Sequence, residues 1–369
     1  MNSKRLVNEF IELVKIGSVS KEEGLFQADL KKRLEDLGLS VIEDDTADQT
    51  GLGAGNLFAV LPGTMDAKPI LFSCHSDTVT PGFDIKPQIK DNAIYSDGTT
   101  ILAADDKAGI AAILEAIRML QEGDVPHRPV ELVFSPGEEI GLMGAKAFDT
   151  SQLNAKYGFV LDSSGPVGNI TVASPTLQRL DFEISGKSAH AGLEPEKGVS
   201  AIEIAAHAIA NMKLGRLDAE TTANIGTITG GAATNIVADK ASFTAEARSI
   251  SEDVLDTQIA HMIQVTKDAA EKFGGEVICT PTEASPGFAF ADDNKTLQIA
   301  HEAIKAIGRT PVNAICGGAS DANVYNAAGI ETVNLSVGYE QIHSCEEYIP
   351  IEELEMAARL VYQLAIRAE

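Results

Sequence analysis

Short apolar segments alternate with amphipathic ones through the first half of this chain. Residues 70–74, 130–134 and 157–161 are apolar runs with the length of buried strands. Between the first two runs, apolar residues over 110–120 recur on one face of a helix, and this pattern stops at Gly123. Strands that alternate with helices predict an α/β domain whose central sheet is mixed but mostly parallel.

A different order of elements occupies the middle of the chain. Over residues 177–282 the expected order is strand, helix, strand, strand, helix, strand, which is the ferredoxin-like split βαβ arrangement. Afterwards the α/β pattern resumes and ends with a helix over 351–368. We therefore expect residues 1–174 and 285–369 to form one domain, and residues 175–284 to form an α+β domain inserted into it.

Length and charge limit the classes of protein that this chain can represent. Its 369 residues favour two domains, and its formal net charge is −25. A protein this acidic lacks the basic surface that nucleic acids and anionic membranes require, so neither is an expected partner.

Charged residues interrupt the amphipathic helix expected over residues 1–18, and no apolar run is long enough to span a bilayer. The four cysteines show no Cys-x-x-Cys spacing, which indicates free thiols and a cytoplasmic protein.

Residues that bind metal ions or carry protons stand directly after the expected strands. They are His75, Asp77, Asp105, Asp106, Glu138, Glu139, Asp162 and His343. In an open α/β sheet, chemistry collects beyond the carboxyl ends of the strands, so these residues are expected to meet there. Alone, each has an ordinary explanation, because surface carboxylates are usually solvated and Asp105-Asp106 could cap the following helix.

The adjacent carboxylates of Glu138 and Glu139 are harder to explain as solvated surface groups. They follow Ser135-Pro136-Gly137 at the end of an apolar run, where a sheet would place them in its crevice. Carboxylates so close repel each other unless a cation or a proton neutralises them. Two imidazoles and several carboxylates suit a pair of divalent ions, and this mixture of nitrogen and oxygen ligands favours zinc, cobalt or manganese over calcium.

Six motifs run through nearly the whole chain in a fixed order. They are Ser73–Val79, Ala104–Gly109, Gly137–Gly141, Leu161-Asp162, Gly186–Gly192, and His343 followed by Glu347–Pro350. Together they resemble the M20 metallopeptidase family, and most of all its peptidase T-like (aminotripeptidase) branch. The resemblance implies a catalytic domain that holds two metal ions and an inserted lid and dimerisation domain. It implies hydrolysis of short peptides with release of the N-terminal residue, by a homodimer.

The resemblance also implies a ligand set for two divalent ions per chain, zinc first, with cobalt or manganese as alternatives. His75 and Asp162 would hold one ion, and Glu139 and His343 the other. Asp105, the acid that directly precedes Asp106-Lys107 in the motif, would bridge the two.

Three further residues receive catalytic roles from the same resemblance. Glu138 would be the general base, and Asp77 would orient His75. His190 lies in the inserted domain, and in the family the equivalent histidine reaches the active site of the other subunit. Read without the motif, His190 in a turn rich in glycine and alanine is an ordinary loop residue.

Substrate binding is the least specific part of the resemblance. In the family, residues matching Asn235 and Arg248 hold the carboxylate end of the substrate, and the glycine-rich turn around Gly318 lies near the metals. Ser163-Ser164 stand where peptidase T typically has two glycines, which leaves tripeptide specificity open.

A carboxypeptidase or an N-acyl-amino-acid amidohydrolase could use the same dinuclear site. A metal-binding or peptide-binding protein without catalysis is the alternative outside the enzymes, but both Glu138 and His190 are present.

Overall fold

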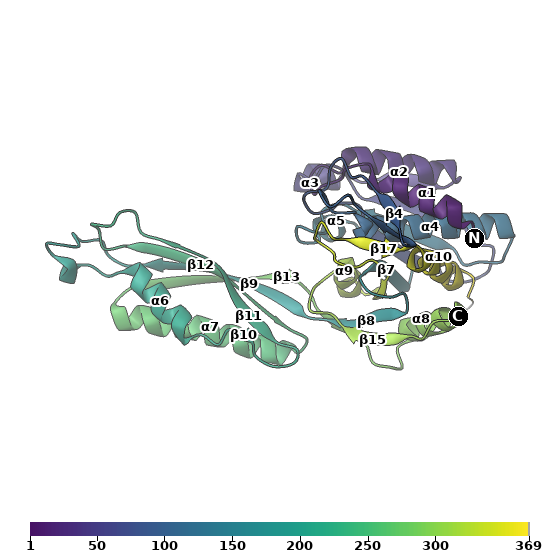
Figure 1. The fold of residues 1–369 in the computed structure, drawn as a ribbon. Helices are drawn as coiled ribbons and strands as arrows, with labels where there is room; N and C mark the ends of the chain where they lie inside the picture. Colours follow the sequence, from purple (N-terminus) through teal and green to yellow (C-terminus); the bar gives the residue numbers. More distant parts are fainter. Residues whose placement is uncertain (368–369) are drawn as a thin grey trace. The chain divides into compact units, whose positions relative to one another are not determined.

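The computed structural model of the chain describes residues 1–367 and divides them between two compact units. One unit contains Met1–Ala173 and the segment that begins at Ala289, and the other is Ser174–Phe288. Figure 1 shows the fold with the chain coloured along its sequence. The helix expected to end at residue 368 runs over Ile351–Ala365, and residue 368 lies outside the described residues.

The first unit is built on a mixed sheet of nine strands within the described residues, in the order β1-β2-β6-β3-β7-β16-β8-β14 with β15 added beside β8. Its strands are β1 (Ser40–Glu43), β2 (Leu57–Leu61), β3 (Ile70–His75), β6 (Val130–Ser135), β7 (Tyr157–Ser163), β8 (Asn169–Ser174), β14 (Phe288–Ala289), β15 (Val312–Ile315) and β16 (Glu331–Ser336). The central strands β6, β3, β7 and β16 run parallel to one another, and β1-β2, β2-β6 and β16-β8 are antiparallel pairs. The added strand β15 runs parallel to β8. The predicted mostly parallel α/β sheet is confirmed.

Helices bury both faces of this sheet. They are α1 (Ser3–Val14), α2 (Gly24–Asp36), α3 (Thr46–Thr50), α4 (Ala104–Gly123), α5 (Met143–Ala147), α8 (Lys295–Ala306), α9 (Asp321–Ala327) and α10 (Ile351–Ala365). Successive side chains of a strand point to opposite faces. Phe72 and Cys74 of β3 join the core that contains α4, whereas Ser73 between them bonds to Tyr325 of α9. All six residues of β3 are buried, as expected for a central parallel strand that is covered on both faces.

A small sheet of β17 (Tyr348–Pro350), β5 (Ala93–Tyr95) and β4 (Gln88–Lys90) completes the first unit. It matters for the site because β17 follows the loop that carries His343. Tyr348 and Tyr95 are register partners, and their rings stack with centroids 5.1 Å apart. The end of that loop is therefore held in place by a strand pairing.

The second unit has the predicted split βαβ order. Its elements are β9 (Thr176–Ser185), α6 (Ala201–Asn211), β10 (Gly215–Arg216), β11 (Thr222–Gly230), β12 (Lys240–Ser249), α7 (Glu252–Phe273) and β13 (Glu276–Ser285). The sheet order is β10-β11-β12-β9-β13, so the short β10 is an addition to the expected four strands. Figure 1 shows α6 and α7 on one face of this sheet, where Phe182 and Phe243 stack at 4.5 Å. Polar residues such as Arg179 alternate with the buried ones along β9, which leaves the opposite face more exposed.

The chain leaves and re-enters the first unit at neighbouring positions. Phe290, just after re-entry, donates its N–H to the carbonyl of Val172, just before departure, at 2.8 Å. In the second unit, the first and last strands, β9 and β13, pair along their whole length. The inserted unit therefore begins and ends on adjacent strands.

Candidate metal centre

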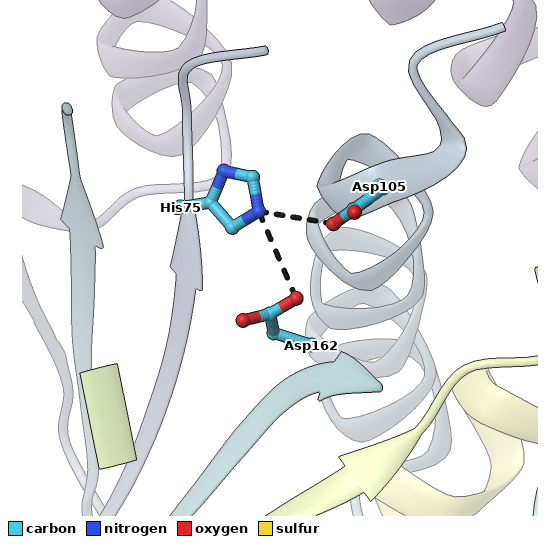
Figure 2. A group of neighbouring side chains, drawn as sticks. All are labelled: His75, Asp105 and Asp162. Carbon is cyan, nitrogen blue, oxygen red and sulfur yellow. Dashed lines mark hydrogen bonds and ion pairs between the residues drawn. The ribbon is translucent and has the colours of Figure 1, made fainter. Parts of the chain in front are cut away.

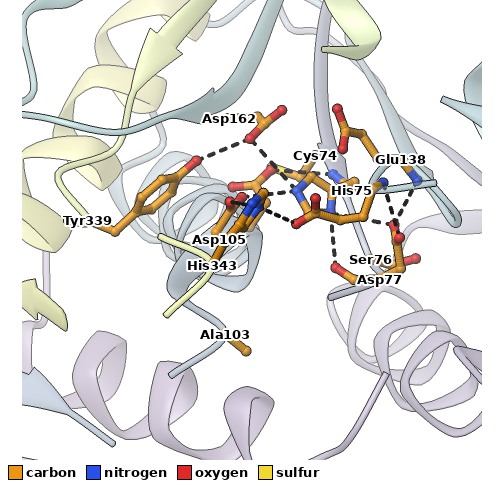
Figure 3. Close-up of polar contacts among 12 residues, drawn as sticks. Cys74, His75, Ser76, Asp77, Ala103, Asp105, Glu138, Asp162, Tyr339 and His343 are labelled. Atoms are coloured by element: carbon orange, nitrogen blue, oxygen red, sulfur yellow. Dashed lines mark hydrogen bonds and ion pairs between the residues drawn. The ribbon is translucent and has the colours of Figure 1, made fainter. Parts of the chain in front are cut away.

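The predicted strand-end residues of the first unit gather at one edge of the central sheet (Figure 3). His75 is the last residue of β3, Asp162 lies near the end of β7, and Glu138 and Glu139 follow β6. Asp105 lies at the start of α4. His343 comes from the loop between β16 and β17. Because β3, β6 and β7 are parallel, their carboxyl ends meet at this edge.

Three of these residues form a compact ligand group at β3 and β7. The Nε2 atom of His75 lies 3.0 Å from Oδ1 of Asp105 and 3.7 Å from Oδ1 of Asp162, as Figure 2 shows. One ligand atom from each residue lies within 4.8 Å of the other two, which is a spacing that a single cation can span. These are the residues expected to hold the first ion.

A second group shares Asp105 with the first. The Nε2 atom of His343 lies 2.9 Å from Oε1 of Glu139 and 3.5 Å from Oδ2 of Asp105. The two oxygens of Asp105 therefore face different histidines, His75 and His343. A carboxylate between two metal ions has this arrangement. Glu138 belongs to a third set of close ligand atoms, with His75 and Glu139.

The electrostatics of the site fit cations. Burial is the largest influence on Glu138 and Asp162, and with neighbouring carboxylates it raises the pKa of both side chains well above the ordinary range. Burial alone would also raise the pKa of Asp105, but hydrogen bonds with His343 and His75 hold that pKa below its usual value. Positive charge from two imidazoles thus compensates only part of the crowded negative charge. Divalent ions between the same nitrogen and oxygen atoms would compensate the rest.

Asp77 forms hydrogen bonds both to His75 and to the turn that carries Glu138 and Glu139. Its backbone oxygen lies 2.9 Å from Nδ1 of His75, so Nε2 of that ring is the nitrogen directed at Asp105. Its buried carboxylate accepts the N–H groups of Glu138 and Glu139 at 2.9 and 3.3 Å, and the hydroxyl of Ser20 at 2.7 Å. A single side chain therefore positions a histidine and the turn that carries two carboxylates.

Two residues that the sequence did not single out brace Asp162. The fully buried Tyr339 donates its hydroxyl to Oδ1 of Asp162 at 3.1 Å (Figure 3). The Asn334 amide donates to the Asp162 carbonyl at 2.6 Å and accepts the Asp162 N–H at 3.0 Å. These two hydrogen bonds join β7 to β16 where the register of the two strands shifts. They hold the backbone of Asp162 and thereby the direction of its side chain.

The glycine-rich turn around Gly318 also belongs to the first unit. The Gly318 N–H donates to Sγ of Cys316 at 3.3 Å. The turn ends at α9, whose first residue, Asp321, is buried and bonded to the hydroxyl of Ser135 at the end of β6. The turn is thereby tied to the strand that precedes Glu138.

Predicted residues of the inserted unit lie at two separate ends of its sheet. His190 and Asn235 share one turn region, where His190 pairs with Ile236 and the Ala191 N–H donates to the Asn235 carbonyl at 3.0 Å. Arg248 lies near the other end of the ten-residue strand β12 and bonds to Glu246. At about 3.3 Å per residue, the eight steps from the start of β12 to Arg248 span roughly 26 Å. The structure therefore brings Asn235 to His190 and does not bring either of them to Arg248.

Comparison with known proteins identifies the family. The model of peptidase family M20/M25/M40 matches residues 71–367, so the chain belongs to this family of peptidases and is a hydrolase, as its motifs predicted. The chain is 51% identical to a solved aminopeptidase PepT from Bacillus cereus, with a TM-score of 0.94 over 99% of this chain and 98% of that one.

Two further relatives cover almost the whole chain. A solved tripeptidase from Staphylococcus aureus is 43% identical, with a TM-score of 0.95 over 99% of this chain and 98% of that one. The protein YqjE of Bacillus subtilis (strain 168), which carries no assigned activity in its name, is 49% identical over 98% of this chain and 97% of its own length. Within the described residues, no helix has the length and apolar character needed to cross a membrane.

Proposed function

We propose that this protein is a dinuclear metallo-aminopeptidase that removes the N-terminal residue from short peptides, with tripeptides as the expected substrates. The observation that carries the proposal is the position of Asp105, whose two carboxylate oxygens face His75 and His343. The aminopeptidase and tripeptidase similar to this chain support the substrate class. Two zinc ions are the expected cofactors, with cobalt or manganese as alternatives, and the free thiols support a cytoplasmic location.

The ligands divide between two ions. His75 and Asp162 would hold the first, Glu139 and His343 would hold the second, and Asp105 would contribute to both. When bound, such ions polarise the scissile carbonyl group and lower the pKa of a water molecule. The protein supplies the geometry, since Asp77 fixes the ring of His75 and backs the turn of Glu139.

Glu138 moves the proton. Its carboxylate takes a proton from the attacking water and delivers it to the nitrogen of the leaving amine, while the C–N bond breaks. It is suited to this role because its backbone N–H is held by Asp77, while its side chain lies close to His75 and Glu139 and is not one of the five proposed ligands. The raised pKa of Glu138 follows first from burial, which favours a carboxyl that accepts and returns protons.

His190 supplies a hydrogen bond to the oxyanion. Its Nδ1 atom accepts the N–H groups of Gly192 and Leu193 at 3.1 and 3.2 Å, so the ring proton resides on the exposed Nε2 atom. A fixed N–H donor of this kind stabilises the negative charge that develops on a carbonyl oxygen. Arg248 pairs with the carboxylate end of the same peptide, because its planar fork fits both oxygens.

We propose that a homodimer brings these two roles together at one site. Arg248 lies roughly 26 Å along β12 from the start of that strand, and the turn that holds Asn235 and pairs with His190 precedes this start. An extended tripeptide spans only about 10 Å. Two chains would present both residues to one tripeptide if His190 and Asn235 come from one subunit and Arg248 from the other.

A panel of substrates tests the proposal. The metal-stripped protein is reconstituted with zinc, cobalt or manganese and assayed on a free tripeptide, its N-acetylated form and its C-amidated form. We expect the free tripeptide to be hydrolysed fastest, with the N-terminal residue as the first product. Faster hydrolysis of N-acetylated amino acids would replace the proposal with an amidohydrolase that uses the same metal site. Release of the C-terminal residue first would indicate a carboxypeptidase.

A further inference from the structure

A buried carboxylate outside the proposed ligand set holds the backbone that carries Asp105. The Glu347 side chain is 1% exposed. Its Oε2 atom accepts the N–H groups of Leu102 and Ala103 at 2.7 and 2.9 Å, and its Oε1 atom accepts the N–H of Asp105 at 3.0 Å. Three main-chain donors within four residues therefore converge on one side chain.

The backbone of this segment needs such a partner. Ala103 has a φ of 63°, in the left-handed region that non-glycine residues rarely adopt, and the dihedral angles of Asp105 are not helical. Ala103 offers no side-chain cap to α4. The buried N–H groups at the start of α4 would otherwise lack acceptors, and an unmet buried donor costs about 1–3 kcal/mol. Glu347 thus caps α4 from a distant part of the sequence.

Glu347 also closes the loop that carries His343. It stands four residues after that histidine and directly before β17, and its own N–H donates to the carbonyl of Ser344 at 3.2 Å. The His343 side chain is 47% exposed, and its backbone has a φ of 60°. The ring contacts Glu139 and Asp105 through its Nε2 atom, and among the described residues the loop that carries it is the only main-chain support of the residue. The position of the loop end therefore decides where the ring lies.

We infer that Glu347 is a positioning residue that sets the separation of Asp105 and His343, and thereby the affinity of the protein for the ion at Asp105, Glu139 and His343. The Glu347 carboxylate fixes the backbone of Asp105 by accepting its N–H group. The Glu347 backbone ends the loop that carries His343, directly before β17. The inference rests on the proposed dinuclear function. It adds a residue that contacts neither the ions nor the substrate.

The variant Glu347→Gln tests this role with little change in shape. An amide has only one carbonyl oxygen, so it cannot accept all three N–H groups, and its NH₂ group would face at least one of these donors. We expect the affinity for the ion at Asp105, Glu139 and His343 to fall about 10- to 100-fold, which is the size of effect that supporting residues have in other metal sites. Affinity for the ion at His75 and Asp162 should change less.

The measurement is a titration of metal-stripped protein with Zn²⁺ in competition with a chromogenic chelator. Glu131 provides a matched control, because it is 2% exposed and its carboxylate accepts the N–H groups of Asn154 and Ala155 at 2.9–3.0 Å, at the opposite end of β6 from the site. Glu131→Gln should lower the Tm of the metal-free protein as Glu347→Gln does, yet bind both ions with wild-type affinity. The kcat of Glu347→Gln should recover at saturating Zn²⁺.

Two results would overturn the inference. A folded Glu347→Gln protein that binds both ions as tightly as the wild type would remove the positioning role and leave the proposed function intact. An equal loss of zinc affinity in Glu131→Gln would show that the effect is general destabilisation. If the wild-type protein bound no ions, the proposed function and the inference would fall together. Should Glu347→Gln fail to fold, Glu347→Asp, whose side chain is one methylene shorter, is titrated in its place against the same expectation.

Discussion

Replacing Glu138 with glutamine should abolish most turnover while leaving the metal site filled. The exchange removes the proton acceptor and keeps the shape of the side chain. The turn should survive, because Asp77 holds it through the backbone N–H groups of residues 138 and 139. The five proposed ligands are untouched. Loss of a general base typically costs 10²–10⁴-fold in rate, which corresponds to about 3–5 kcal/mol of transition-state stabilisation.

The assay separates proton transfer from metal binding. Zinc content and kcat on a free tripeptide are measured on the same preparation, with Glu139→Gln as the matched neighbour. We expect Glu138→Gln to retain two ions per chain with a greatly reduced kcat, and Glu139→Gln to lose one ion, since its Oε1 atom lies 2.9 Å from the ring of His343. A Glu138→Gln protein that turns over within threefold of wild type would refute the assignment of the base. If it lost its zinc while Glu139→Gln kept both ions, the two roles would be reversed.

Four other outcomes are expected. Dialysis against a chelator should abolish activity and added Zn²⁺ should restore it, with about two ions per chain at full recovery; full activity without metal would contradict the dinuclear site. Tyr339→Phe removes a hydrogen bond to a charged acceptor, worth about 1.5–3 kcal/mol, so zinc affinity should fall about 10- to 100-fold in a chelator competition; an unchanged affinity would mean that Asn334 alone orients Asp162. Arg248→Ala should erase the rate penalty for C-amidation and preserve the penalty for N-acetylation, and a persisting amidation penalty would place the carboxylate elsewhere. Mixing inactive His190→Ala with inactive Glu138→Ala chains should regain activity in heterodimers, and none should appear if His190 serves its own chain.

The arrangement of the metal site could be anticipated because it depends on strand ends. His75, Glu139 and Asp162 each follow an apolar run, and parallel strands bring their carboxyl ends to one edge of a sheet. Periodicity also sufficed for the inserted unit, whose alternating strands and two helices appear in the expected order. The small β10 escaped prediction because two residues carry no readable period.

The supporting residues could not be predicted in this way. Tyr339 and Asn334 reach Asp162 across more than 170 residues of sequence, so no local pattern marks them. Glu347 stood within a recognised motif, but its role depends on three backbone N–H groups that point at it only once the chain has folded. The separation of His190 from Arg248 depends on the length of β12, because the sequence assigns a catalytic role to one and a substrate-binding role to the other without giving their positions on the sheet.

The neighbouring departure and re-entry points have a consequence for protein engineering. Val172 and Phe290 are hydrogen-bonded to each other inside the first unit, so a short designed loop could join these ends in place of everything between them. The shortened chain would retain its central strands β6, β3, β7 and β16 and all five proposed ligands, since each ligand lies outside Ser174–Phe288. Metal uptake could then be studied on a minimal scaffold, and inserts from other proteins could be grafted at the same junction to alter which peptides are accepted.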